Sequence, residues 1–316
     1  MISILLSSYN GEKYITEQID SLLNQTVQDF KLYICDDKST DTTFSIILKY
    51  AENHRTKIIT MHNKVNSGGA KHNFMKMIIA HKDDYVMLCD QDDVWMSNKI
   101  EKSLNKIKEM EEAYGSSMPL LVHSDLRVVD NNLNVIADSY EKMAYTCFAK
   151  NALRNIVQMN IAAGCTIMFN RALADLIQDE PDFFVVHDWW LTLVAAAFGR
   201  IGTIYEPTIL YRQHGENDIG AKKILSFGYI VYVLSHTGIM TAKINDSHRQ
   251  AESFLNLYRD KLSESQKELL NAYALIPQLS KIKKLQTKIK YKTFRYGFAR
   301  KIAEIMILLI ERRIIK

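Results

Sequence analysis

The stretch Tyr-Val-Met-Leu-Cys-Asp-Gln-Asp-Asp-Val-Trp, residues 85–95, decides the fold and chemistry expected of this chain. Its first five residues are apolar, which is typical of a strand buried on both faces of a parallel sheet. Asp90, Asp92 and Asp93 follow at the end of that strand. Crowded carboxylates repel one another, and Mg²⁺ or Mn²⁺ relieves the repulsion and completes its shell with phosphate oxygens. The stretch therefore predicts a metal-bridged diphosphate, although a solvated loop or a helix N-cap also explains acids at this place.

The rest of the first half alternates apolar runs with amphipathic stretches, which predicts strands separated by helices. The predicted strands are Ile2–Ser7, Phe30–Cys35, Lys57–His62 and Tyr85–Cys89, and the predicted helices are Tyr14–Leu23, Thr42–Asn53 and Ala70–His81. This order is typical of an α/β protein with a Rossmann-like, mostly parallel sheet flanked by helices. Polar motifs follow three of the strands, at residues 7–10, 36–37 and 90–93. Ligands of parallel sheets bind at the carboxyl ends of the strands, so these motifs are expected to converge.

The second half has a different pattern. A charged helix at Lys99–Tyr114 is followed by strand candidates at Leu120–Val129, Ala163–Phe169, Thr203–Tyr205 and Ile209–Arg212, and by an apolar helix at Trp189–Phe198. From residue 222 onward the pattern is helical. We therefore expect a first domain of residues 1–221 and a helical C-terminal extension of residues 222–316.

Composition indicates an ordinary globular protein, with 47% hydrophobic and 24% charged residues in a chain of 316. The four cysteines stand singly and lack metal-ligand spacing, and no signal peptide is visible, so we expect reduced thiols and a cytoplasmic location.

Charge is distributed unevenly along the chain. Residues 281–316 hold 12 Lys or Arg and two Glu, whereas the remainder has a net charge of −6. A basic tail on an acidic body indicates an anionic partner, and we expect residues 281–316 to lie on the inner face of the cell membrane. Phe294–Ile315 suits a helix on an anionic bilayer, although docking on its own domain is the alternative. The uncharged stretch Ile224–Thr241 favours a buried or interfacial helix over a membrane span.

Six motifs occur in a fixed order along the chain. They are SSYN at residues 7–10, CDDKSTD at 35–41, NSGGA at 66–70 with Asn73 beyond, DQDD at 90–93, HDWW at 187–190 and YRQHGEN at 211–217. The set resembles the family 2 glycosyltransferases of the A-type fold, in particular rhamnosyltransferase-like enzymes of bacterial surface polysaccharide synthesis. The resemblance covers residues 1–220.

The resemblance implies a nucleotide site. Asp37 matches the carboxylate that reads the base, with Ser7 and Tyr9 beside it, although turn and capping chemistry also explains acids here. Gly68 and Gly69 permit positive φ or close backbone approach to an anion at a helix N-terminus, or form a plain turn.

The resemblance also implies the metal ligands. Asp90 and Asp92 match the D-x-D motif, the first serving nucleotide or metal and the second binding the metal. His214 matches a further ligand, which favours Mn²⁺ over Mg²⁺. A lone histidine is otherwise more often structural.

Asp188 is the candidate general base, because its neighbours His187 and Trp189 would desolvate it in part and raise its basicity. The family has Glu before this Asp, and this chain has His187. A helix N-cap also explains Asp188. Trp189 and Trp190 are candidates for an acceptor platform, with core packing the alternative for at least one.

The implied activity is metal-dependent, inverting transfer of a hexose-type sugar. Donor candidates are dTDP-rhamnose and, as an alternative, a UDP-hexose, and the acceptor is expected to be a saccharide, in particular a lipid-linked one.

Other function classes compete with this interpretation. A haloacid-dehalogenase-type phosphatase would use Asp90 as nucleophile and Asp92 as acid/base, but leaves SSYN and CDD unexplained. A nucleotidyltransferase commonly opens with a Gly-rich basic loop, which residues 7–11 are not. A non-catalytic membrane-associated binding protein would explain only the basic tail. Nucleic-acid binding is not expected, because aromatic residues do not alternate regularly with the basic ones.

Overall fold

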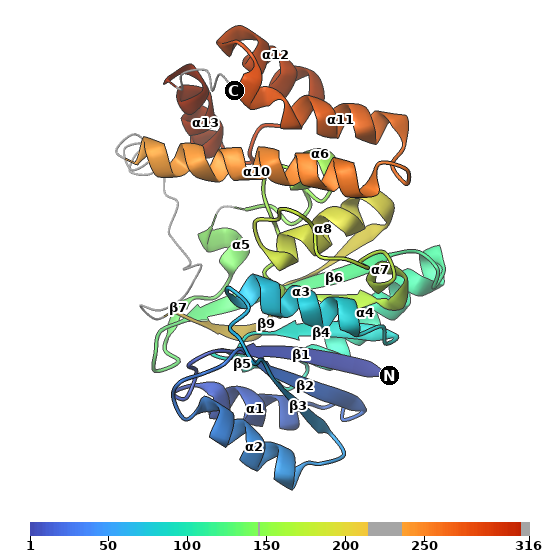
Figure 1. Ribbon diagram of the computed structural model, residues 1–316, viewed down its shortest axis with the longest axis vertical. Helices are drawn as coiled ribbons and strands as arrows, with labels where there is room; N and C mark the ends of the chain where they lie inside the picture. Colours follow the sequence, from blue (N-terminus) through green and yellow to red (C-terminus); the bar gives the residue numbers. More distant parts are fainter. Residues whose placement is uncertain (145, 214–235, 311–316) are drawn as a thin grey trace. The chain divides into compact units, whose positions relative to one another are not determined.

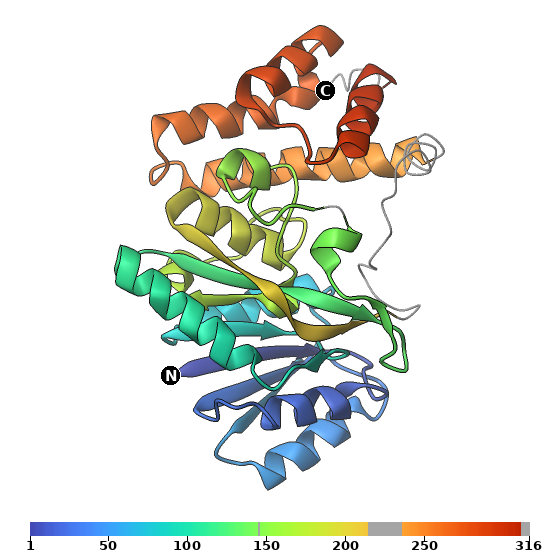
Figure 2. The ribbon, with the colours of Figure 1, turned by 180° about the vertical axis from the view of Figure 1, so that it is seen from behind.

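The structure is a computed structural model, and it describes residues 1–144, 146–213 and 236–310 (Figure 1, Figure 2). The chain divides into two compact units. The first comprises residues 1–141, 162–180 and 199–221, and the second comprises residues 142–161, 181–198 and 222–316. The predicted boundary at residues 221 and 222 lies outside the described residues and stays a prediction.

The first unit is built on one mixed sheet. Its described strands are β1 (Ile2–Ser8), β2 (Phe30–Asp36), β3 (Ile58–His62), β4 (Tyr85–Cys89), β5 (Val94–Trp95), β6 (Leu120–Val129), β7 (Val135–Ala137), β8 (Met168–Asn170) and β9 (Arg200–Arg212). Their order is β3-β2-β1-β4-β8-β6-β9-β5, and β7 pairs with β6. The strands β3, β2, β1 and β4 are mutually parallel, and β8 is antiparallel to both β4 and β6.

Helices cover both faces of this sheet (Figure 1, Figure 2). The helices of the first unit are α1 (Ile15–Leu23), α2 (Thr43–Asn53), α3 (Ala70–Ala80), α4 (Lys99–Tyr114) and α7 (Arg171–Ala174). Right-handed crossovers put α1 and α2 on one face, and the return crossover from β3 to β4 puts α3 on the other. Every residue of β1 is buried between these layers, which explains why the strand is mostly apolar. The predicted α/β fold, a mostly parallel sheet flanked by helices, is confirmed.

The second unit is helical. Its helices are α6 (Leu153–Ile156), α8 (His187–Phe198), α10 (Thr237–Tyr258), α11 (Glu264–Ala274), the 3₁₀ turn η2 (Ile276–Gln278), α12 (Lys281–Tyr291) and α13 (Phe298–Ile310), while α5 (Tyr140–Met143) spans the boundary with the first unit. Trp190 of α8 packs against Phe254 and Tyr258 of α10, with ring centroids 5.2 and 6.2 Å away. Among the described helices, none has the length and apolar character needed to cross a bilayer.

Two strand predictions differ from the structure. The run Ala163–Phe169 begins as a 3₁₀ turn, η1 (Gly164–Thr166), and only its end belongs to β8. The two short strands predicted at 203–205 and 209–212 are one strand, β9, that continues through Pro207. Its pairing with β6 shifts register beside Pro207, so the residue that cannot donate to the ladder sits at an irregularity.

Candidate active site

Three loops converge at the carboxyl ends of β1, β2 and β4. The registers pair Ser8 with Asp36 and Leu6 with Cys89, so the residues that follow each strand start from the same edge. The predicted convergence of residues 7–10, 36–37 and 90–93 is therefore present in the first unit.

Asp37 organises the loop between β3 and α3. It is 2% exposed, and its carboxylate accepts hydrogen bonds from Asn63 Nδ2 at 2.6 Å and from the Ser67 backbone N–H and hydroxyl at 2.8 and 2.7 Å. A buried carboxylate with several donors is held in one orientation. Asp37 thus holds the β3–α3 loop in place at this edge of the sheet. Its role in reading the nucleotide base stays a prediction.

Asn73 continues this network beneath the loop. Its fully buried amide donates to Ser7 Oγ at 2.8 Å and to the Cys35 carbonyl at 3.0 Å, and accepts from Asn63 at 3.0 Å. Residues from β1, β2, the β3–α3 loop and α3 are therefore joined through one side chain.

The backbone of the β3–α3 loop requires glycine. Gly68 and Gly69 have φ of 92° and 118°, where side chains with a Cβ are strained. Gly69 lies immediately before α3, so this turn leads directly into the helix N-terminus. This geometry agrees with the predicted need for positive φ and leaves an anion-binding role as a prediction.

Gln91 joins the first loop to the acidic loop. Its side chain accepts from the Tyr9 N–H and donates to the Tyr9 carbonyl, both at 2.9 Å, while the Tyr9 side chain is half exposed. A Cβ on Gly11 would stand 2.2 Å from Gln91 Oε1, so a side chain at position 11 would displace the Gln91 amide from Tyr9.

The acidic loop forms a partly buried cluster. Ligand atoms of Asp90, Asp93 and Cys165 lie within 4.8 Å of one another. Asp93 Oδ1 accepts from the Arg212 backbone N–H at 3.1 Å, and the Cys165 thiol lies beside the buried carboxyl group. Burial, and then the charges of Asp92 and Asp90, hold the pKa of Asp93 well above its ordinary value of 3.8.

These donors fit a hard divalent cation. A buried carboxylate held close to the charges of Asp90 and Asp92 is what Mg²⁺ or Mn²⁺ stabilises. Cys165 fits such an ion poorly, because burial raises the pKa of its thiol well above 9.0. Asp92 is outside the three-residue cluster, and His214 lies outside the described residues, so both ligand assignments stay predictions.

Arg212, at the end of β9, fastens the acidic loop. Its buried guanidinium donates to the Asp92 carbonyl at 2.9 Å and the Asn131 carbonyl at 2.5 Å, pairs with Glu17, and lies 4.8 Å from the Tyr14 ring. In the sequence, Arg212 belongs to the motif at residues 211–217, and no role was predicted for it. Asp93, Gln91 and Asn63 were likewise given no firm role in the site, because the partners of each lie far away in the chain.

The candidate base lies in the second unit, in the first turn of α8. Asp188 is 7% exposed, and Trp189 is 8% exposed and donates from Nε1 to the Ile156 carbonyl at 2.6 Å. Trp190 is fully buried in the aromatic core of this unit. Trp190 thus packs in the core, which was the alternative to a role in binding the acceptor. The acceptor-binding roles of Trp189 and Trp190 stay predictions.

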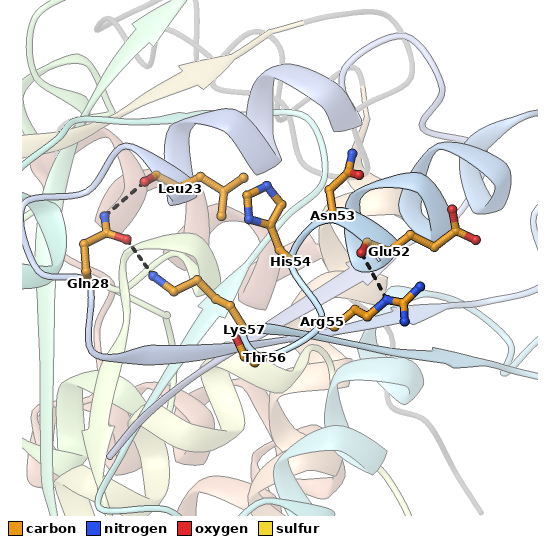
Figure 3. A pocket seen from close by; sticks show the side chains of 8 residues that line it. All are labelled: Leu23, Gln28, Glu52, Asn53, His54, Arg55, Thr56 and Lys57. Atoms are coloured by element: carbon orange, nitrogen blue, oxygen red, sulfur yellow. Dashed lines mark hydrogen bonds between the residues drawn. The ribbon is translucent and has the colours of Figure 1, made fainter.

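A hollow of about 480 Å³ lies at the opposite edge of the sheet (Figure 3). It is lined by Leu23, Gln28 and residues 52–57, at the amino ends of β2 and β3. Lys57 Nζ donates to Gln28 Oε1 at 2.6 Å across it. Ligands of parallel sheets bind at the other edge, so we assign no role to this hollow.

Comparison with known proteins gives consistent matches. The chain is 28% identical over 232 residues to the dTDP-rhamnosyl transferase RfbG of Shigella flexneri, covering 68% of this chain and 74% of that protein. It is 25% identical over 176 residues to the UDP-Glc:alpha-D-GlcNAc-diphosphoundecaprenol beta-1,3-glucosyltransferase WfgD of Escherichia coli, covering 55% and 61%. The structure of S. aureus TarS 1–349 in complex with UDP aligns with a TM-score of 0.54 at 19% identity, covering 88% of this chain and 71% of that one, which shows the shared fold.

The family assignment rests on a match to a family model. Residues 3–177, more than half of the chain, match Glycosyl transferase family 2. This range contains β1 to β4, the Asp37 network and the acidic cluster. The chain therefore belongs to glycosyl transferase family 2.

Proposed function

We propose that this chain transfers a sugar from a nucleoside diphosphate donor to a saccharide acceptor, with inversion at the anomeric carbon, in the synthesis of a surface polysaccharide. The observation that carries the proposal is the meeting of two polar systems at the carboxyl ends of β1, β2 and β4. One is the Asp37–Asn73 network, suited to a nucleoside, and the other is the Asp90–Asp93 cluster, suited to the cation of a diphosphate. The names of RfbG and WfgD support the donor class and the polysaccharide context.

Asp188 is proposed as the general base. The acceptor hydroxyl oxygen attacks the anomeric carbon and forms the new glycosidic bond, while the bond from that carbon to the diphosphate oxygen breaks. The hydroxyl proton passes to the Asp188 carboxylate, and the nucleoside diphosphate departs. Base catalysis of this kind contributes about 10²–10⁴-fold.

The carboxylates of Asp90, Asp92 and Asp93 are proposed to hold a divalent cation, with His214 as a further ligand. When bound, Mn²⁺ or Mg²⁺ neutralises the charge that grows on the departing diphosphate. Asp92→Ala should weaken metal-dependent donor binding, and calorimetry in Mn²⁺ that gives the wild-type affinity would contradict this assignment.

We propose dTDP-rhamnose as the specific donor, with a UDP-hexose as the alternative. The name of RfbG supports the first and the TarS–UDP complex supports the second. A lipid-linked saccharide is the proposed acceptor, as the name of WfgD suggests. Thermal shifts with dTDP, UDP and GDP, each with and without Mn²⁺, identify the base, because a bound ligand raises the melting temperature.

The decisive test compares the wild type with Asp188→Asn. The variant should keep nucleotide binding and lose transfer by about 10²-fold or more. Transfer at the wild-type rate would remove Asp188 from the mechanism. Release of inorganic phosphate in place of a nucleoside diphosphate would favour the phosphatase class, which the family match does not support.

A further inference from the structure

Helix α12 of the second unit (Figure 1) has inverted amphipathicity. Lys284 and Lys288 are 1% and 0% exposed, whereas Ile282 and Ile289 are 72% and 61% exposed. A helix that packs on a core normally buries its apolar residues and exposes its charges. The two isoleucines are seven residues apart, so they lie on one face of the helix.

A buried ion pair fixes this orientation. Lys288 Nζ donates to Glu304 Oε1 of α13 at 2.6 Å and to the Thr293 carbonyl at 3.1 Å, and both charged side chains are 2% exposed or less. The second carboxylate oxygen of Glu304 accepts from the Arg295 backbone N–H at 3.0 Å. Breaking such a pair is strongly unfavourable, so the helix cannot rotate to bury the isoleucines.

The charges around the isoleucines are positive. Lys281 and Lys283 are exposed, and they lie just over a quarter turn to either side of Ile282. Among the described residues 281–310 the sole acid is Glu304, which is buried. On the neighbouring helix α11 the exposed Glu268 pairs with Lys290 at 3.1 Å, which neutralises it.

We propose that the α12 surface, defined as Ile282 and Ile289 with Lys281 and Lys283, docks on an anionic lipid bilayer. Exposed aliphatic side chains flanked by lysines match a membrane interface, where the apolar residues enter the acyl boundary and the lysines meet anionic headgroups. A second copy of this chain fits less well, because a symmetric contact would oppose lysine to lysine. This surface does not depend on the proposed function.

Flotation of the full chain tests the proposal, with vesicles of phosphatidylcholine alone and of phosphatidylcholine mixed with phosphatidylglycerol. The wild type should float with the anionic vesicles and not with the neutral ones. The affinity of the double variant Ile282→Glu/Ile289→Glu for the anionic vesicles should fall by at least about 30-fold, because two partly inserted isoleucines are lost. Lys283→Gln should lose about 5-fold, and added salt should weaken wild-type binding.

Ile239→Glu is the matched control, because Ile239 is 54% exposed on α10 of the same unit. It should float like the wild type. Circular dichroism should show all variants folded, since every altered side chain is exposed. Equal flotation of the double variant and the wild type would overturn the proposal. So would a wild-type dimer, seen by light scattering, that the double variant abolishes. No nucleotide is present in this assay, so its outcome is separate from that of sugar transfer.

Discussion

Replacement of Arg212 by Met tests how the acidic loop is held. The guanidinium is 2% exposed and donates to the carbonyls of Asp92 and Asn131. Met keeps much of the apolar stem and removes every donor. The backbone N–H bond to Asp93 is retained in the variant, so only the side-chain contribution is tested.

The magnitude follows from these contacts. Two carbonyl groups in part-buried contacts lose a charged donor, at about 1–3 kcal/mol each. The pair with Glu17 adds less than about 1 kcal/mol, because that carboxylate is 53% exposed and screened by solvent. Loss of the desolvation cost of the guanidinium offsets part of the sum, which leaves about 2–5 kcal/mol. For a unit of this size the melting temperature should fall by roughly 5–15 °C.

The assay combines thermal unfolding with calorimetric Mn²⁺ binding. Release of the Asp92 backbone should also lower the Mn²⁺ affinity, whereas a purely structural role would change the melting temperature alone. Arg212→Lys should be intermediate, because an ammonium cannot reproduce the planar fork of donors. The control is Arg55→Met, because Arg55 is exposed and donates one weak bond to the Glu52 carbonyl at 3.3 Å. A melting temperature of Arg212→Met within about 1 °C of the Arg55→Met value would refute the reasoning.

Three further predictions concern buried polar groups. In metal-free protein Asp93→Asn should raise the melting temperature at neutral pH, because the raised pKa of Asp93 makes its ionisation destabilising as pH rises above 3.8. This gain in melting temperature should vanish below pH 3.8. Added Mn²⁺ should stabilise the wild type more than the variant. Burial lowers the pKa of His123 from 6.5 to about 4, so its contribution to stability is present above pH 6.5 and is lost as pH falls toward 4. His123→Gln should therefore reduce the loss of stability between about pH 7.5 and about pH 5 by up to about 2 kcal/mol, and an unchanged loss in urea titrations at both pH values would contradict this. Asn73→Ala should cost about 2–4 kcal/mol and weaken nucleotide binding, since it removes the buried hydrogen bonds to Ser7 Oγ, to the Cys35 carbonyl and from the Asn63 amide; calorimetry that finds wild-type nucleotide affinity would separate this network from the site.

The first half of the fold was predictable from local pattern. The strands predicted at Phe30–Cys35 and Tyr85–Cys89 match β2 and β4 to within one residue, because strands in the middle of a covered sheet are mostly apolar. Strand prediction was less accurate for β8 and β9, in the part of the sheet that mixes parallel and antiparallel pairing. An apolar run such as Ala163–Phe169 carries no periodicity, and Pro207 reads as a strand break until its partner β6 is known.

The sequence by itself determined that acids and glycines would stand at the carboxyl ends of parallel strands, because strand alternation and turn chemistry are local properties of the chain. Tertiary structure alone decided which carboxylate is buried, which residue fastens it and which face of α12 meets solvent. Asp93, Arg212 and the Lys288–Glu304 pair depend on partners brought together by packing. Burial of a charge is fixed by the whole set of surrounding side chains, and no local pattern specifies that set.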